Sequence, residues 1–182
     1  MTAPQRRPAF ARGFTLLELV AVVIAIGILA GVALERLLPL IGRAERVAFL
    51  RVQGQLQSAL MLETAQRLSR GEGATIPRLS GSNPMDYLLK PPENYLGSYP
   101  NPVHREVQPG RWYFDEGRGR LVYRVGRHAR FESDEGPADR VEFRVALGFR
   151  DRNGNGMYDA GADVFDGIWM QPVYAYDWSE SE

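Results

Sequence analysis

The chain lacks cysteine altogether and contains only two histidines, His104 and His128, among its 182 residues. Without cysteine there can be no disulfide, no thiol nucleophile and no cysteine-based zinc site. No glycine-rich phosphate-binding motif is present either. These absences favour a non-enzymatic protein whose domain is held together by its apolar core or by a bound ion.

The chain also lacks a surplus of charge of either sign, since it has 22 basic and 22 acidic side chains. A nucleic-acid-binding domain usually shows a clustered excess of basic residues. We therefore expect no nucleic-acid partner. The length suits one globular domain together with an N-terminal helix.

An apolar run extends from Phe14 to Leu34 and contains a single charged residue, Glu18. Its length is close to the roughly 20 residues that a helix needs to cross a bilayer. A charged side chain inside such a helix costs on the order of 2.5–3.5 kcal/mol on insertion scales. Glu18 therefore needs a positive partner, either at the start of its own helix or on a neighbouring molecule.

The residues before the apolar run include Arg6, Arg7 and Arg12 and no acid, which favours a cytoplasmic N-terminus. A cleaved secretory signal would have a shorter apolar core followed by a small-residue cleavage site. Here the run is followed by Glu35-Arg36-Leu37-Leu38-Pro39 instead, so we expect no cut by the usual signal peptidase. On hydropathy alone, a plain single-span anchor is the alternative to a more specialised segment.

The segment Gly13-Phe14-Thr15-Leu16-Leu17-Glu18-Leu19 resembles the class III signal of type IV pilins and type II secretion pseudopilins. The resemblance implies that a prepilin peptidase cuts between Gly13 and Phe14 and methylates the new amine on Phe14. It also implies that Glu18 pairs with the N-terminal amine of an adjacent subunit during filament assembly. Many type IV pilins close a C-terminal loop with a disulfide, so the lack of cysteine favours a pseudopilin or minor pilin.

The same resemblance implies the partners and the location of the chain. The partners are other pilin or pseudopilin subunits, the prepilin peptidase, an inner-membrane assembly platform and membrane lipid. The chain is expected to cross the inner membrane once with its C-terminal domain in the periplasm, and then to enter a periplasmic or extracellular filament. The resemblance distinguishes neither a secretion pseudopilus from a type IV pilus nor a major from a minor subunit.

We expect an α+β, pilin-like fold in which a long N-terminal helix packs on a C-terminal antiparallel sheet. The expected parts are a cleaved basic leader (1–13), a transmembrane and assembly helix (14–38), an amphipathic helix of the globular domain (39–70), a connecting variable loop (71–110) and the sheet (111–182). Apolar residues at helical spacing, Phe49, Val52, Leu56 and Leu60, predict the helix face that packs on the sheet. Two helices joined near Pro39 are the alternative to one.

The C-terminal part shows strand patterns. Trp112 to Phe114 and Leu121 to Val125 flank a turn-rich segment and predict a hairpin. Residues 141–147 alternate between apolar and other side chains, which predicts a strand with one buried face. A last extended stretch is expected from Ile168 to Trp178. Within the connecting loop, Asn83 followed by Pro84 predicts a capped short helix.

The loop at residues 151–163 resembles the first part of an EF-hand calcium loop. Oxygen-bearing side chains fall at alternate positions with a glycine at the sixth; the proposed ligands are Asp151, Asn153, Asn155, the Met157 carbonyl, Asp159 and Asp163. The twelfth position is Ala162, where an EF-hand has glutamate, and Asp163 could supply that carboxylate. We therefore expect a structural calcium ion; a double Asn-Gly turn with solvated acids is the alternative. Major pseudopilins bind calcium in a C-terminal loop, so the resemblance implies the same.

A different class of function is a membrane-anchored binding domain that does not polymerise. Its binding surface would be formed by aromatic side chains near the C-terminus: Trp169, Tyr174, Tyr176 and Trp178. Packing in the core of the sheet explains these residues equally well.

Overall fold

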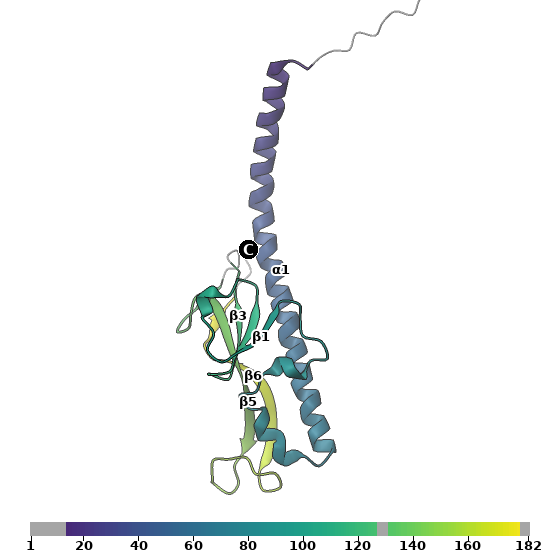
Figure 1. Ribbon diagram of the computed structural model, residues 1–182, viewed down its shortest axis with the longest axis vertical. Helices are drawn as coiled ribbons and strands as arrows, with labels where there is room; N and C mark the ends of the chain where they lie inside the picture. The colour runs from purple at the N-terminus through teal and green to yellow at the C-terminus, as the bar shows by residue number, and fades with distance from the viewer. Residues whose placement is uncertain (1–13, 127–130, 179–182) are drawn as a thin grey trace, which may run out of the picture. The chain divides into compact units, whose positions relative to one another are not determined.

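The computed structural model describes residues 14–126 and 131–178. By its internal contacts the chain divides into two units, Met1–Leu38 and Pro39–Glu182. One helix, α1 (Leu16–Ser69), contributes to both units (Figure 1). Because the helix continues through Pro39, the alternative of two helices joined there is wrong.

In the first unit the described chain is helix from Leu16 onward, and its side chains from Phe14 to Leu37 are all exposed. The apolar part of α1 is long and apolar enough to cross a membrane, as judged by length and composition, and none of it is buried. A helix that is apolar all round needs an apolar environment, which this unit does not provide for itself.

In the second unit, α1 packs on the sheet through the predicted face. Phe49, Val52, Leu56 and Leu60 are all buried, which confirms the helical spacing seen in the sequence. The helix ends at Ser69, and Gly71 follows with a φ of 73°, a left-handed conformation that glycine adopts without strain.

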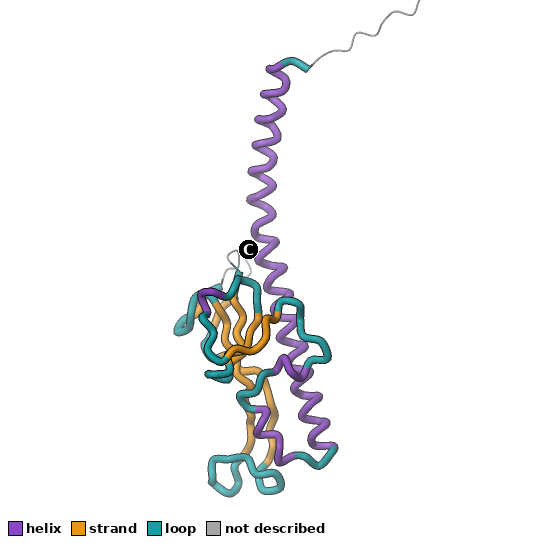
Figure 2. Tube along the Cα trace, in the orientation of Figure 1, coloured by secondary structure: helices purple, strands orange, loops and turns teal. Residues whose placement is uncertain are grey.

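The main sheet has five strands in the order β1-β2-β3-β5-β6 (Figures 1 and 2). Their bounds are β1 Tyr95–Tyr99, β2 Trp112–Asp115, β3 Arg120–Arg124, β5 Arg140–Arg150 and β6 Val164–Pro172. A separate pair is formed by β4 (Glu132–Ser133) and β7 (Tyr176–Asp177). The predicted hairpin is confirmed as β2 and β3, and the long alternating segment as β5.

The sheet differs from the prediction at one edge. β1 lies within the segment expected to be a connecting loop, and it pairs with β2 in parallel, not antiparallel. The other pairings of the main sheet are antiparallel. The fold is therefore α+β with an antiparallel-dominated sheet.

Three short 3-10 helices complete the segment between α1 and β2: η1 (Gly73–Leu79), η2 (Pro84–Tyr87) and η3 (His104–Glu106). The Asn83 side chain accepts a hydrogen bond from the Met85 N–H at 3.2 Å, and Pro84 is the first residue of η2. This confirms the capped short helix.

The core of the second unit is an aromatic cluster centred on Phe49. The Phe49 ring stacks on Trp112 with centroids 5.3 Å apart and 4° between the planes. Tyr123 and Trp178 also pack against Phe49, at 5.1 and 4.8 Å between centroids. Aromatic pairs at such separations add to the free energy of area burial.

The outer edge of β6 is covered by one side chain from α1. The Gln57 amide donates to the Ile168 carbonyl and accepts from the Met170 N–H, each at 3.0 Å. A side-chain amide thus occupies the position where a neighbouring strand would bind. This contact joins the helix to the sheet through the backbone of β6.

Candidate functional site

The predicted processing and assembly site consists of Gly13, Phe14 and Glu18, and the described part of the chain begins within it, at Phe14. Gly13 lies outside the described residues, whereas Phe14 is 70% exposed and precedes α1. Glu18, in the first turn of the helix, is also exposed. Phe14 and Glu18 therefore both lie at the N-terminal end of α1, and both side chains are accessible.

The backbone at this helix end reveals a local role for Thr15. The Thr15 hydroxyl accepts a hydrogen bond from the Glu18 N–H at 3.2 Å, so Thr15 caps the first turn. Thr15-Leu16-Leu17-Glu18 has the spacing of a capping box, in which a glutamate occupies the third helical position. A carboxylate there is also stabilised by the positive end of the helix dipole. Sequence reasoning left the partner of Glu18 open between its own helix start and a neighbour, and the resemblance implied the amine of an adjacent subunit. This capping pattern was missed, although the four residues already display it.

The loop between β5 and β6 is organised by its acidic side chains. The Asp151 carboxylate accepts the N–H groups of Gly154 and Gly156, at 2.6 and 2.7 Å. These bonds, with that from Gly156 the largest contribution, lower the pKa of Asp151. Asp163 in turn accepts the N–H groups of Arg152 and Asp159, at 2.9 and 2.7 Å.

Two of the proposed ligands donate hydrogen bonds to one carboxylate oxygen of a third in the middle of the loop. The side-chain amides of Asn153 and Asn155 both donate to Oδ2 of Asp159, at 2.7 and 2.6 Å. The Oδ1 atoms of the two asparagines each accept one backbone N–H, from Asn155 and Met157 respectively. A carbonyl oxygen has two lone pairs, so each Oδ1 keeps one for a further partner.

The donor chemistry of this loop suits a hard cation, because its available side-chain atoms are carboxylate and amide oxygens. In residues 14–126 and 131–178, however, no three His, Cys, Asp or Glu side chains gather as a metal-binding group. Three aspartates therefore do not by themselves form a cage. A cation would also need the asparagine oxygens and the Met157 carbonyl.

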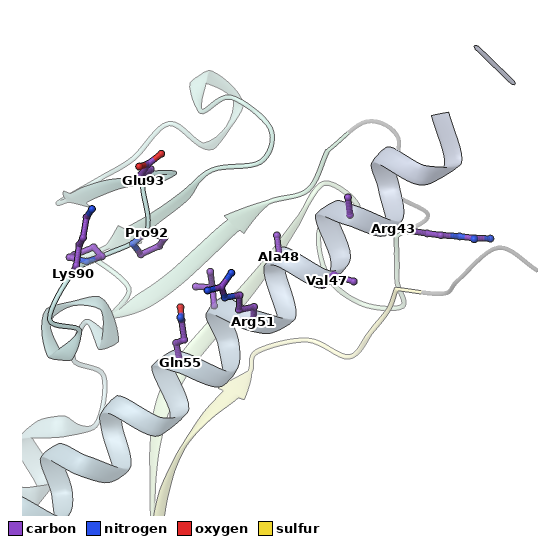
Figure 3. Close-up of a pocket in the computed structure, with 11 residues that line it drawn as sticks. Arg43, Val47, Ala48, Arg51, Gln55, Lys90, Pro92 and Glu93 are labelled. Carbon is purple, nitrogen blue, oxygen red and sulfur yellow. The ribbon is translucent and has the colours of Figure 1, made fainter. Parts of the chain in front are cut away.

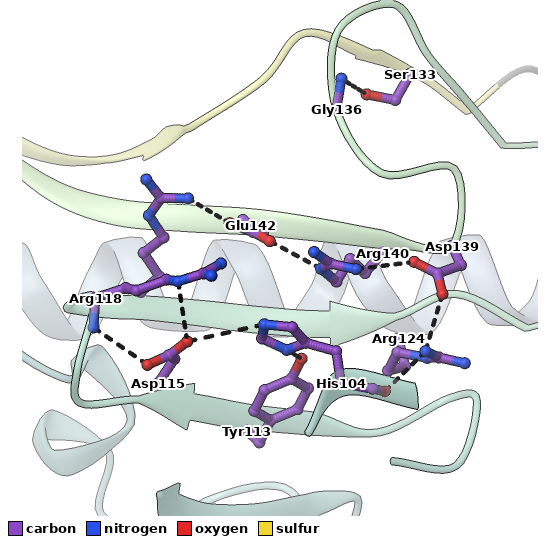
Figure 4. A network of polar contacts seen from close by, with 11 residues as sticks. His104, Tyr113, Asp115, Arg118, Arg124, Ser133, Gly136, Asp139, Arg140 and Glu142 are labelled. Carbon is purple, nitrogen blue, oxygen red and sulfur yellow. Dashed lines mark hydrogen bonds and ion pairs between the residues drawn. The ribbon is translucent and has the colours of Figure 1, made fainter. Parts of the chain in front are cut away.

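A second polar arrangement, which sequence reasoning did not identify, lies on strands β2, β3 and β5 (Figure 4). Glu142 is buried and accepts hydrogen bonds from Arg120 at 2.6 Å and from Arg140 at 2.8 Å. Asp139 binds Arg124 at 2.9 Å and Arg140 at 3.2 Å. The alternating pattern of β5 indicated that Glu142 would lie on a solvated face; it is buried because two arginines cover it.

His104 of η3 belongs to the same arrangement. Its side chain is only 17% exposed. Its Nδ1 is hydrogen-bonded to the Tyr113 hydroxyl, and its Nε2 lies 3.9 Å from Asp115. His128 lies outside the described residues.

Burial governs the ionisation of this polar arrangement. Burial, followed by the charge of Arg140, lowers the pKa of His104, and burial raises the pKa of Tyr113. Burial acts to raise the pKa of Glu142, but the hydrogen bonds from Arg140 and Arg120 outweigh it, so the net pKa is lowered. The histidine is therefore neutral and Glu142 ionised near neutral pH. The charges are paired within the strands, which is the arrangement of a structural network.

The C-terminal aromatic residues divide between core and surface. Trp178 is 6% exposed and belongs to the core cluster, against which Tyr176 also packs. Trp169 is 41% exposed, and Tyr174 is partly buried. Core packing therefore accounts for two of the four residues, and Trp169 is the most exposed of the set.

The fold and the N-terminal residues define a class of protein: an α+β domain that continues from an exposed, apolar helix. Such a helix is typical of a membrane-anchored or self-assembling subunit. The polar groups on β2, β3 and β5 are paired with one another, and those of the loop at residues 151–163 form turns.

The chain is similar to a "Probable minor fimbrial protein" from Dichelobacter nodosus, with 31% identity over 104 residues. The match covers 52% of this chain and 65% of the relative, so it spans less than two thirds of the relative's length. No family model and no solved structure matches the chain. The similarity fits the pilin family at a coarse level, suggests a pilus subunit and favours a structural over a catalytic role.

Proposed function

We propose that the chain is a structural subunit, a pilin or pseudopilin, of a type IV pilus-like or type II secretion filament assembled from the inner membrane. The observation that carries the proposal is the position of Phe14 to Glu18, which follow Gly13 in the sequence, at the start of a helix whose side chains are all exposed as far as Leu37. The similarity to a fimbrial protein supports it. The first unit then spans the inner membrane and the second unit lies in the periplasm before assembly.

Processing is the first step of this function. A prepilin peptidase would remove residues 1–13 and methylate the amine of Phe14. Glycine at the cut site lets a protease approach the backbone closely, because glycine has no Cβ.

Mass spectrometry of the chain purified from its own cells tests this step. We expect a mature chain that begins at Phe14 and carries an N-methyl group, and we expect Gly13→Val to retain the leader. Thr2→Val, within the leader and away from the cut site, is the matched control and should be processed normally. A mature wild-type chain that keeps Met1 to Gly13 would rule out this processing.

Assembly is the second step, and Glu18 has two candidate roles in it. One is pairing with the new amine of an adjacent subunit, which needs the negative charge. The other is the second half of a capping box, in which the Glu18 side chain would accept the Thr15 N–H; glutamine serves there as well as glutamate.

Two substitutions separate these roles. If the charge is required, Glu18→Gln and Glu18→Val both leave membrane insertion intact and exclude the subunit from filaments sheared from the cells. If the residue acts only as a cap, Glu18→Gln assembles normally and Glu18→Val does not. We expect the first result, because a neutral amide leaves the amine unpaired in the apolar region.

We also infer that the loop at residues 151–163 binds a structural calcium ion through the side chains of Asp151, Asn153, Asn155, Asp159 and Asp163 and the carbonyl of Met157. The observation in its favour is that Oδ1 of Asn153 and Oδ1 of Asn155 each accept one backbone N–H and keep a lone pair with which to bind a cation. The ion would cross-link the two ends of the loop, as a disulfide does in other proteins.

Thermal unfolding of the full chain in detergent tests calcium binding. We expect calcium to raise Tm, a chelator to abolish that increase, and Asp151→Ala with Asp159→Ala to remove it. The control is Asp166→Ala, which alters an exposed carboxylate outside the loop. If chelation leaves the Tm of the unmutated chain unchanged, the loop is only a turn.

The alternative function is a single-span membrane-anchored domain that binds a ligand and does not polymerise. The exposure of Trp169 is the observation that favours it. Fractionation discriminates the two functions: a filament subunit appears in the sheared fraction, whereas an anchored binding domain stays with the membrane.

A further inference from the structure

The described residues of the second unit form an open groove. The groove has a volume of about 700 Å³ and lies between residues 43–55 of α1 and the segment Lys90–Glu93 (Figure 3). Its apolar lining consists of Ala44, Val47, Ala48, Val52, Pro91 and Pro92. A second hollow, lined by Leu88 and Leu89 among others, continues along the same helix and shares Arg51, Gln55 and Lys90 with the first.

The apolar side chains around this groove are exposed to an unusual degree. Val47, which lines the groove, is 65% exposed, and Leu89, which lines the second hollow, is fully exposed. Covering such side chains is favourable by about 25 cal/mol for each Å² removed from water. An exposed apolar groove with a charged rim is typical of a protein-protein contact.

The rim of the groove is mainly basic. Arg51 and Lys90 are exposed, and neither takes part in a hydrogen bond or ion pair among the described residues. Figure 3 shows Arg51 on the side of α1 that faces Lys90 and Pro92. Arg43 adds a third positive charge to the lining, and Glu93 is the single acid among the described residues that line the groove. The occupant should therefore carry carboxylates.

The chain itself presents such a surface elsewhere on the second unit. We define the acidic turn as Glu132, Asp134, Glu135 and Asp177, on and beside β4 and β7; all four side chains are exposed. Glu132 and Asp177 lie directly opposite each other in the strand pair. Like charges in this position destabilise a strand pair. Among the described residues, none of the four carboxylates is hydrogen-bonded or ion-paired.

The acidic turn is also held rigidly by hydrogen bonds and close packing. The Ser133 hydroxyl donates to the Ala175 carbonyl at 3.1 Å and accepts the Gly136 N–H at 3.1 Å, which holds the turn against the neighbouring strand. Gly136 packs so closely on Tyr174 that an added Cβ would lie 2.8 Å from its ring. A rigid turn loses little conformational freedom on binding.

We propose that the groove between α1 and Lys90–Glu93 binds the acidic turn of a second copy of this chain. The two surfaces differ, so the contact is heterologous, and each copy can bind one neighbour through its groove and another through its turn. Such contacts propagate from copy to copy and form an open, helical assembly where the rotation between neighbours does not close into a ring. The inference rests on the proposed filament function and identifies the surfaces that join the globular units.

Disulfide cross-linking in cells that assemble the full chain tests the contact. Because the chain has no cysteine, a variant with Arg51→Cys and Asp134→Cys carries the sole two thiols of the subunit. We expect oxidation to produce a ladder of dimers, trimers and longer species on a non-reducing gel. Each single variant should give no ladder, and neither should Arg51→Cys with Arg150→Cys, which places the second thiol on an exposed part of β5.

A charge exchange provides a second measurement. Arg51→Glu with Lys90→Glu should lower the amount of subunit in sheared filaments by at least about tenfold, since like charges across an interface cost several kcal/mol. Adding Asp134→Arg and Glu135→Arg to that variant should restore it. The unfolding midpoint should stay unchanged, because both groove side chains are exposed.

The outcomes separate this inference from the proposed function. If the unmodified chain forms filaments but the test pair gives no ladder and charge reversal has no effect, the docking is wrong and the filament function stands. A ladder from the control pair, or an Arg51→Cys adduct with a different protein, also overturns docking between copies. If the unmodified chain never appears in filaments, both proposals fail.

Discussion

At the scale of single residues, Gln57 of α1 makes two hydrogen bonds to the backbone of β6. Its amide satisfies one donor and one acceptor of β6 that would otherwise lie against α1 without a partner. We expect Gln57→Ala to lower the free energy of unfolding by about 1–3 kcal/mol, the range for a buried polar group left unsatisfied.

The measurement is urea denaturation of the full chain in detergent. Gln66→Ala is the matched control, because Gln66 is an exposed glutamine of the same helix. An equal effect of the two substitutions would mean that the Gln57 bonds contribute nothing beyond helix propensity.

Two glycines should respond in opposite directions to the same substitution. The Gly126 N–H donates to Oε1 of Glu45 at 2.7 Å, and Tyr123 donates to the same oxygen at 2.8 Å. An added Cβ on Gly126 would lie 2.2 Å from the second Glu45 oxygen, so Gly126→Ala must displace that carboxylate. Gly54, within α1, has open space around its Cα.

We therefore expect Gly126→Ala to destabilise the chain by about 1–3 kcal/mol through the broken polar network. Gly54→Ala should stabilise it by up to about 1 kcal/mol, because alanine favours a helix interior. Thermal unfolding of both variants, compared with the unmodified chain, is the check. Shifts of the same sign would contradict this account of Glu45.

At the scale of elements, the polar arrangement on β2, β3 and β5, to which His104 belongs, predicts that the stability of the chain depends on pH. The pKa of His104 lies below its ordinary value of 6.5, chiefly because the ring is buried. Below about pH 6.5 the unfolded chain takes up a proton that the folded chain resists, so the free energy of unfolding falls as pH decreases. Glu142 acts in a lower window, because its pKa lies below its ordinary value of 4.5 and its contribution is lost only as pH falls through that lowered pKa.

We expect His104→Gln to flatten the change in unfolding free energy between about pH 7.5 and 5.5 and to leave the fall below about pH 4.5 in place. Urea denaturation over a series of pH values measures both windows. An unchanged slope in the upper window would show that His104 titrates normally in the folded chain.

The same elements show what sequence patterns can and cannot predict. The β2–β3 hairpin was readable because its strands and its turn are contiguous in sequence and depend on local signals. β1 was not, because its parallel partner is reached through a long connection and its residues carry no alternation of their own. Glu142 shows the same limit: its burial depends on arginines from β3 and β5, which a single-strand pattern does not report.

In the candidate sites, residues that are close in sequence could be predicted to act together, whereas residues that only the fold brings together could not. Thr15 and Glu18 are three residues apart, so their capping pattern could have been read directly. The side chains of the 151–163 loop were also contiguous, and the structure added the bonds that draw Asn153 and Asn155 to Asp159. The groove beside Lys90 could not be predicted, since it depends on how the segment before β1 lies against α1.

At the scale of the whole molecule, the chain divides into two units with separate sets of internal contacts. We therefore expect substitutions in the first unit to alter insertion and assembly without changing the folding stability of the second. Glu18→Val should leave the unfolding midpoint of the second unit unchanged. Leu56→Ala, which removes a fully buried side chain, should lower its free energy of unfolding by about 2–5 kcal/mol.

Intrinsic fluorescence measures the unfolding of the second unit directly, because that unit contains the three tryptophans, Trp112, Trp169 and Trp178. Trp112 and Trp178 are buried in the core, so their emission changes when that core opens. A variant that combines Glu18→Val with Leu56→Ala should show the effect of Leu56→Ala alone, since the effects of distant and independent sites add within about 0.5 kcal/mol. A midpoint shift caused by Glu18→Val would mean that the first and second units fold as one. Loss of assembly in that variant could then no longer be assigned to the carboxylate.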